Sequence, residues 1–351
     1  MNSMAKWRNK LRGILTPFTN SIFAIIIGII AGGIILWING YPPLKSYYYL
    51  FHDSLFTKYG LLRSFSYAIP LILTALTWSI GMRVGIYNIG AEGQLIIGAG
   101  ATVAASTFIL PTGIHLGVAM IFAMAAGMAW SLPAALLKIK RGVHEVVSTI
   151  MLNWIAIYFV RYLVDEPLSD PEAAHGSIPI AESSRFPILF EGSILTGAIF
   201  VSIAFAIIMY IILWHTKTGQ HLRAAGLSKE IARNSGINVA RMTIISFLLG
   251  GAAAGLAGCT LTAGMPPEWT IYRTLATLLG FGFTGIGVGM IGRNHPIGGI
   301  FAAVFFGSLW SGSYFLQLNL QIPIEITDIL TGVIIIFVAI PALIEMIRKR
   351  R

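Results

Sequence analysis

The chain has 351 residues, of which 56% are apolar and only 11% are charged. Soluble globular domains carry about 25% charged residues, so this composition excludes an ordinary soluble globule. The formal net charge is +10, and the only cysteine, Cys259, excludes an intrachain disulfide or a thiolate metal cluster.

Repeated apolar stretches divide the chain into candidate membrane spans. A hydrocarbon core of about 30 Å needs about 20 apolar residues in a helix. The first stretch follows four basic residues and lacks a small-residue cleavage site, so we expect a retained helix rather than a signal peptide. The sequence predicts an all-α polytopic membrane protein, one membrane domain over residues 1–351, with about ten spans near 20–38, 64–80, 86–110, 114–137, 143–164, 194–214, 243–263, 275–291, 297–315 and 322–344.

The basic residues predict how these spans are oriented. With the N-terminus in the cytoplasm, 18 of the 24 Lys and Arg residues fall in inner loops and the other 6 fall outside. This distribution satisfies the positive-inside rule. An even number of spans also places the C-terminus in the cytoplasm, and the positive charge is then a topology signal rather than a sign of nucleic-acid binding.

The segment 81–100 carries polar side chains at the start of an apolar run. Asn88, Glu92 and Gln94 lie among glycines there. An acidic side chain at the centre of a membrane helix costs roughly 2.5–3.5 kcal/mol, so Glu92 should face protein or water. It either lies along a polar pathway or bonds a neighbouring helix and holds the bundle together. Asn153, deeper in the fifth span, has the same two interpretations.

Beside that fifth span, His144 and Glu145 resemble half of a zinc-protease motif. Ser148 stands where the second histidine would be, so the sequence predicts no metal site. We expect Glu145 to pair with Arg141, one helical turn away.

The outer loop at 165–192 has six acidic residues, one basic residue and four prolines. The prolines predict an irregular segment. Its acidic surface is suited to docking a soluble partner by charge complementarity, although an ordinary solvated loop has the same composition.

The inner loop at 215–242 is the most polar segment between two spans. Ser228 suits a helix N-cap and Gly236 suits the residue after a helix end, so residues 229–235 should form short helical turns. Leu227 and Ile231, four residues apart, should share an apolar face. Such a face can enter a groove on a partner, or the segment can lie on the membrane as a connector.

Two glycine-rich segments follow the inner loop. Residues 250–258 are all small except Leu256, which predicts close helix packing in the membrane. Residues 280–285 match a Gly-x-Gly-x-x-Gly pattern, but they lie inside a span without a preceding strand, so we do not expect a dinucleotide site. The chain also lacks a Gly-Lys dipeptide and therefore a phosphate-binding loop. We expect no catalytic residue and no enzyme activity.

Four motifs together resemble one family. Residues 87–94 read YNIGAEGQ, residues 143–153 read VHEVVSTIMLN, residues 222–238 begin LRAAGL and end GIN, and GFTGIGV at 282–288 precedes RNHP at 293–296. They resemble the permease subunits of binding-protein-dependent ABC importers, which include ribose, other simple-sugar and branched-chain amino acid permeases. The NIGAEGQ form resembles the nucleoside branch.

This resemblance implies a division of labour among several chains in a bacterial cell membrane. A second permease subunit, often a different one, would complete the pathway. A cytoplasmic ATPase would bind ATP and Mg²⁺, so no cofactor is expected in this chain, and an extracytoplasmic binding protein or lipoprotein would deliver the substrate. The implied pathway residues are Asn88, Glu92, Gln94 and Asn153, and the implied ATPase-coupling residues are Arg223, Gly226, Leu227, Glu230, Ile231, Arg233 and Gly236.

Three other functions remain open at this point. A sugar or branched-chain amino acid permease would keep the mechanism and change the cargo. An ion-coupled secondary transporter would normally have paired membrane carboxylates or broken repeated helices, whereas only Glu92 lies well inside a span. An intramembrane enzyme lacks an assembled catalytic group.

Overall fold

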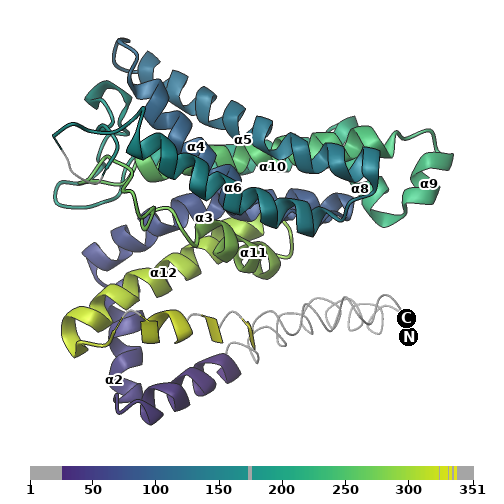
Figure 1. Ribbon diagram of the computed structural model, residues 1–351. Helices are drawn as coiled ribbons and strands as arrows, with labels where there is room; N and C mark the ends of the chain where they lie inside the picture. Colours follow the sequence, from purple (N-terminus) through teal and green to yellow (C-terminus); the bar gives the residue numbers. More distant parts are fainter. Residues whose placement is uncertain (1–25, 173–175, 324, 331, 334–335, 338–351) are drawn as a thin grey trace, which may run out of the picture. The chain divides into compact units, whose positions relative to one another are not determined.

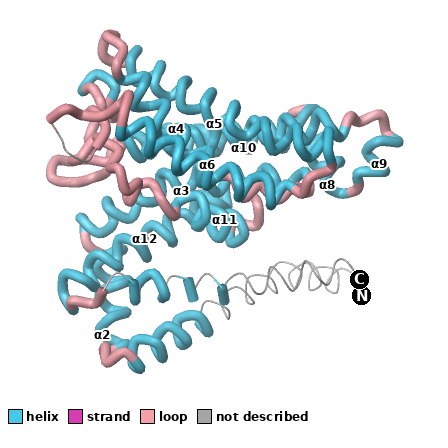
Figure 2. Tube along the Cα trace, in the orientation of Figure 1, coloured by secondary structure: helices cyan, strands magenta, loops and turns pink. Residues whose placement is uncertain are grey.

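The computed structural model describes residues 26–172, 176–323, 325–330, 332–333 and 336–337 (Figure 1). Within these residues the chain is helical, and its only β-type pairings are isolated bridges between loops (Figure 2). The predicted all-α class is therefore confirmed. Both chain ends, whose cytoplasmic placement was predicted, lie outside the described residues.

The chain divides into two compact units. The smaller comprises the described residues up to Gly60 and from Leu309 onward, and the larger comprises Leu61–Ser308. The smaller unit begins with a helix over Ile26–Ile38, followed by α2 (Pro43–Tyr47) and a π-helix, η1 (Tyr48–Asp53). Helices α3 (Lys58–Val84) and α12 (Pro296–Leu320) contribute residues to both units.

The larger unit holds the remaining elements. These are α4 (Ala91–Ser106), α5 (Ile114–Arg141), α6 (Glu145–Asp165), the short 3-10 helix η2 (Glu182–Ser184), α7 (Ala198–His215), α8 (Lys217–Leu227), α9 (Lys229–Asn234), α10 (Val239–Thr262) and α11 (Phe281–Ile291).

Six described helices are long and apolar enough to cross a membrane, namely α3, α5, α6, α7, α10 and α12. They confirm a multi-pass membrane protein, but not the number of ten spans. The predicted spans at 86–110 and 275–291 contain the shorter helices α4 and α11. In the second of these the helix begins only at Phe281, because Leu275 and Gly280 have φ angles of +56° and +94°, which interrupt a right-handed helix.

Glycines allow α10 to pack closely against α4 and α5. A Cβ atom added to Gly255 would lie 2.1 Å from the Ala123 carbonyl oxygen of α5, and one added to Gly98 of α4 would lie 2.3 Å from the Gly255 oxygen. No side chain fits at such distances, so the backbones themselves are in contact. The packing role predicted for residues 250–258 is confirmed.

Two groups of loops lie at opposite ends of the larger unit (Figure 1, Figure 2). The turns after α3 and α5, together with α8 and α9, lie at one end, where the inner loops were predicted. The long connections after α6 and α10, predicted to be outside, lie at the other end.

Candidate functional site

The start of α4 is built by hydrogen bonds from three predicted polar residues. Asn88 Oδ1 accepts from the Gly90 backbone N–H at 3.0 Å and from Gln94 Nε2 at 3.3 Å. From α6, Asn153 Oδ1 accepts from the Gly93 N–H at 2.9 Å, and its Nδ2 donates to the Ile89 carbonyl at 3.0 Å. Together these bonds hold the turn before α4 and the first turn of that helix.

Glu92 joins α4 to the beginning of α11. Its Oε1 accepts from the Gly280 N–H at 2.5 Å and its Oε2 accepts from the Gly282 N–H at 2.6 Å. These N–H groups have no intrahelical acceptor, because they lie at a helix N-terminus, where the helix dipole also favours a carboxylate. A Cβ atom on Gly282 would lie 2.3 Å from the Glu92 backbone nitrogen, so this contact requires glycine.

The four predicted pathway residues therefore lie together, but they differ in what their polar atoms do. All four side chains are at most 3% exposed. Glu92 and Asn153 bond the backbone of their own chain. Asn88 Nδ2 and Gln94 Oε1 are buried and find no partner among the described residues. These two neighbouring amides therefore each have one polar atom without a hydrogen-bond partner among the described residues. The role of the four residues in a pathway stays a prediction.

The predicted pairing of Glu145 with Arg141 is wrong. Glu145 forms an ion pair with Lys138 instead, and its Oε1 accepts from the Tyr87 N–H at 3.2 Å. The reason is that α5 ends at Arg141 and Gly142 adopts φ +67°, so Arg141 and Glu145 do not share a helix. Glu145 links the ends of α5, α6 and the segment before α4.

The predicted helical turns of the inner loop are confirmed as α9. Ser228 Oγ accepts from the Ile231 N–H at 3.3 Å and caps the helix, and Gly236 follows its end with φ +80°. Residues 217–227 form a further helix, α8, which the sequence pattern did not predict. Because Ser228 is extended between α8 and α9, Leu227 and Ile231 do not lie on one continuous helix.

Both apolar side chains of this segment nevertheless point away from the protein. Leu227 is 90% exposed and Ile231 is 69% exposed, whereas Leu222 and Ala225 bury the inner side of α8. Gly226 is the contact between α8 and α3, since a Cβ atom there would lie 2.1 Å from the Arg83 carbonyl oxygen. The remaining predicted coupling residues lie along the same two helices or at the end of α9, namely Arg223, Glu230, Arg233 and Gly236.

At the opposite end, the acidic loop pairs with the segment after α10. The Ile180 N–H donates to the Trp269 carbonyl at 2.7 Å, and the Phe186 N–H donates to the Ala263 carbonyl at 2.8 Å. Apart from η2 the described loop is irregular, as its prolines predicted.

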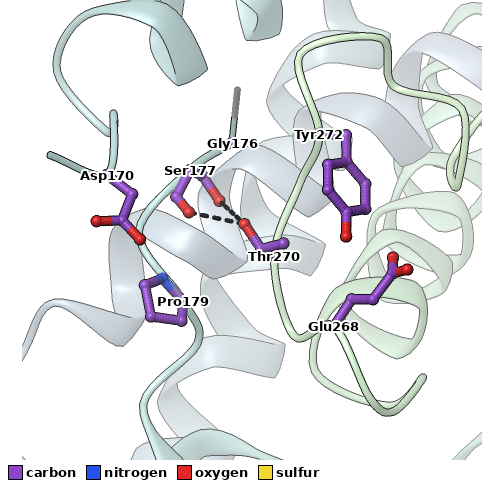
Figure 3. A pocket seen from close by; sticks show the side chains of 7 residues that line it. All are labelled: Asp170, Gly176, Ser177, Pro179, Glu268, Thr270 and Tyr272. Atoms are coloured by element: carbon purple, nitrogen blue, oxygen red, sulfur yellow. Dashed lines mark hydrogen bonds between the residues drawn. The ribbon is translucent and has the colours of Figure 1, made fainter. Parts of the chain in front are cut away.

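Figure 3 shows a pocket between these two segments, in which Thr270 Oγ1 donates to the Ser177 carbonyl at 2.7 Å. The residues around it include two carboxylates and are Asp170, Gly176, Ser177, Pro179, Glu268, Thr270 and Tyr272. Burial and the Glu268 carboxylate beside it raise the pKa of Tyr272. Among the described side chains, no group of three His, Cys, Asp or Glu residues is arranged to hold a metal ion.

Comparison with known proteins identifies the family. A family model described as the permease component of a branched-chain amino acid transport system matches residues 60–339. The chain belongs to this permease family. The permease is 34% identical to the guanosine ABC transporter permease protein NupP of Bacillus subtilis over 94% of each chain. It is 31% identical to the nucleoside ABC transporter permease protein NupB of Lactococcus lactis, covering 96% of this chain and 94% of that one.

A third relative has a different cargo in its name. The permease is 28% identical to the glucose ABC transporter permease protein TsgB13 of Haloferax volcanii, over 90% of this chain and 85% of the other. The predicted family is confirmed, and with it a multi-pass protein of the bacterial cell membrane that acts as a transport component.

Proposed function

We propose that this chain is a transmembrane subunit of an ATP-driven importer of nucleosides. The observation that carries the proposal is the 34% identity to a guanosine permease over 94% of both chains. The 28% identity to a glucose permease makes a simple sugar the alternative cargo.

Uptake of labelled guanosine, adenosine and uridine tests the cargo. In cells that lack this gene, nucleoside uptake should be lost, and in cells that carry it, excess ribose and leucine should not compete. Unchanged nucleoside uptake, after other routes are removed, would contradict the nucleoside assignment and leave the sugar alternative. Depletion of ATP with the ion gradients clamped should also stop uptake; continued uptake would indicate an ion-coupled transporter.

The proposal includes two further subunits, which are a second permease in the membrane and an ATPase at its cytoplasmic surface. Bacillus subtilis and Lactococcus lactis each have a second permease similar to this chain, NupQ at 33% identity and NupC at 26%. We therefore expect a second permease, so that this chain supplies one half of the pathway. The exposed Leu227 and Ile231 suit a groove on a cytoplasmic ATPase, which would bind ATP and Mg²⁺.

A binding protein or lipoprotein outside the cell would deliver the nucleoside. The acidic loop and its pocket offer a polar surface for it at the outer end (Figure 3). In this proposal, hydrolysis of ATP in the partner moves α8 and α9. Because Gly226 contacts the end of α3 directly, that motion reaches the membrane helices.

Within the pathway, Asn88 and Gln94 are the candidates for substrate contact. Their unused Nδ2 and Oε1 atoms can donate to and accept from a base edge or a ribose hydroxyl. A neutral polar substrate needs such partners, since each unmet buried hydrogen bond costs about 1–3 kcal/mol. Glu92 and Asn153 would act there through the backbone that they hold in place.

A further inference from the structure

A cluster of cationic side chains surrounds Trp214 at the end of α7. The Arg83 guanidinium, from the end of α3, lies 4.9 Å from the Trp214 ring centre, and the Arg223 guanidinium of α8 lies 5.6 Å from it. The His295 ring, just before α12, is 4.6 Å from the same ring. We call Arg83, Trp214, Arg223 and His295 the Trp214 cluster.

The positive charge of this cluster is not compensated by the described part of the chain. Among the described residues, Arg83 donates only to neutral acceptors, the backbone carbonyls of Asn294 at 3.0 Å and Arg293 at 3.3 Å. No described carboxylate forms an ion pair with Arg83, Arg223 or His295. Burial and then the Arg83 charge lower the pKa of His295, as expected in a positive environment.

One hydrogen-bond donor of the cluster is also unused. Arg223 Nε is buried and has no partner among the described residues. A buried N–H without an acceptor is unfavourable, and a guanidinium presents its N–H groups as a planar fork that matches a phosphate group. Among the described residues, the cluster thus lacks an acceptor that carries negative charge.

The position of the cluster indicates where this acceptor comes from. Tyr210 and Trp214 lie in the last turns of the apolar helix α7, and their rings stack at 5.5 Å. Tyr and Trp at the end of a membrane helix are typical of the headgroup level. The end of α7 is an inner end in the predicted topology, and basic pockets between helices on the cytoplasmic side suit anionic headgroups.

We propose that the Trp214 cluster binds the phosphate group of an anionic phospholipid in the cytoplasmic leaflet. Arg223 donates through its guanidinium fork, and Arg83 adds charge from the end of α3. Trp214 keeps both guanidinium groups in place through its ring face. The lipid would bridge α3, α7 and α8 at the base of the inner loop. The exposed Leu227 and Ile231 lie farther along that loop and remain available to a protein partner.

The test compares lipid retention by the full-length chain and by single variants, without ATPase. Each protein is purified with its partner permease from vesicles in which phosphatidylglycerol replaces phosphatidylcholine stepwise, and the retained lipids are measured by mass spectrometry. Wild type should retain phosphatidylglycerol preferentially. Arg223→Gln should lower this preference about fivefold, the effect of one arginine at a membrane surface. Lys140→Gln removes one charge from an exposed side chain at the end of α5 and should leave the preference unchanged.

Three results would overturn the proposal. The first is an unchanged preference in Arg223→Gln, or an equal loss in Lys140→Gln. The second is abolition of the preference by inorganic phosphate, which would assign the cluster to a free phosphate ion. The third is an Arg223→Gln variant that retains the lipid but, in a separate co-purification with the ATPase, no longer binds it, which would assign the cluster to that partner. If Arg223→Gln does not accumulate, Arg223→Lys keeps the charge without the planar guanidinium fork and should show a smaller loss in the same direction.

Discussion

At the residue scale, Glu92 shows how one buried carboxylate positions a segment nearly two hundred residues away in the sequence. Its two oxygens accept from Gly280 and Gly282, so the backbone that enters α11 is held against α4. An amide cannot replace it, because the NH2 group of glutamine would face a backbone N–H. The geometry favours an anchoring role for Glu92 over direct substrate contact.

Glu92→Gln should therefore lower the melting temperature of the purified permease. The variant loses one acceptor and leaves a buried N–H unpaired, at a cost of about 1–3 kcal/mol. Thermal unfolding in detergent measures this effect, and Glu191→Gln, at an exposed acid of the outer loop, should melt as wild type does. A Glu92→Gln protein with unchanged melting and reduced uptake would contradict the anchoring role and support substrate contact.

His295 provides a pH dependence with a definite sign. Its Nδ1 accepts from the Ile297 N–H at 3.2 Å and so caps α12, which requires an unprotonated Nδ1. Burial and the charge of Arg83 lower the pKa of His295 from its usual value near 6.5. The unfolded chain then binds a proton at this site more readily than the folded one, so stability is lost as the pH falls below about 6.5.

His295→Asn should flatten this loss of stability in acid. Asparagine can cap the helix through Oδ1 but does not titrate. Melting temperatures from neutral to acidic pH in neutral detergent measure the effect, with wild type as the reference. Equal slopes for both proteins below pH 6.5 would show that His295 does not contribute.

At the element scale, α8 and α9 are two short helices because Ser228 is extended between them. The Ser228 hydroxyl caps α9, while α8 packs against the rest of the larger unit through the buried Leu222 and Ala225. Leu227 and Ile231 bury little surface within the protein's own core, since both are mainly exposed. Burial of such side chains stabilises contact with a partner by roughly 1.5–3 kcal/mol each.

The double variant Leu227→Asp/Ile231→Asp should abolish association with the ATPase and stop uptake. Both side chains are exposed, so the permease itself should accumulate and melt normally. Co-purification of the ATPase with a tagged permease measures the association. The matched control is Leu44→Asp/Phe56→Asp, at exposed apolar residues of the smaller unit. Retained ATPase in the first variant would place the docking surface elsewhere.

At the scale of the whole molecule, the chain has a polar segment at each end of its larger unit (Figure 1). One end carries the Trp214 cluster and α9, and the other carries the acidic loop with its pocket. Between them α4, α5 and α10 pack through glycine contacts that leave no room for side chains. The arrangement suits a transport subunit that meets one partner at each surface.

The sequence alone determined the all-α membrane class and the ends of α9, but not the number of spans. Composition and long apolar runs specify membrane helices, because the bilayer leaves backbone groups no other partner. Ser228 and Gly236 defined α9 because caps act within a few residues. Residue motifs such as NIGAEGQ were enough to indicate the family that the comparisons confirmed.

The tertiary structure alone decided which polar groups meet. Glu92 and Gly280 are 188 residues apart, and no local pattern indicates that contact. Glu145 pairs with Lys138 rather than Arg141, because a left-handed Gly142 turns the chain between them. The Trp214 cluster gathers residues from three helices and one turn. Hydrogen bonds and charge pairs depend on distances of a few ångströms, which helix packing sets and sequence spacing does not.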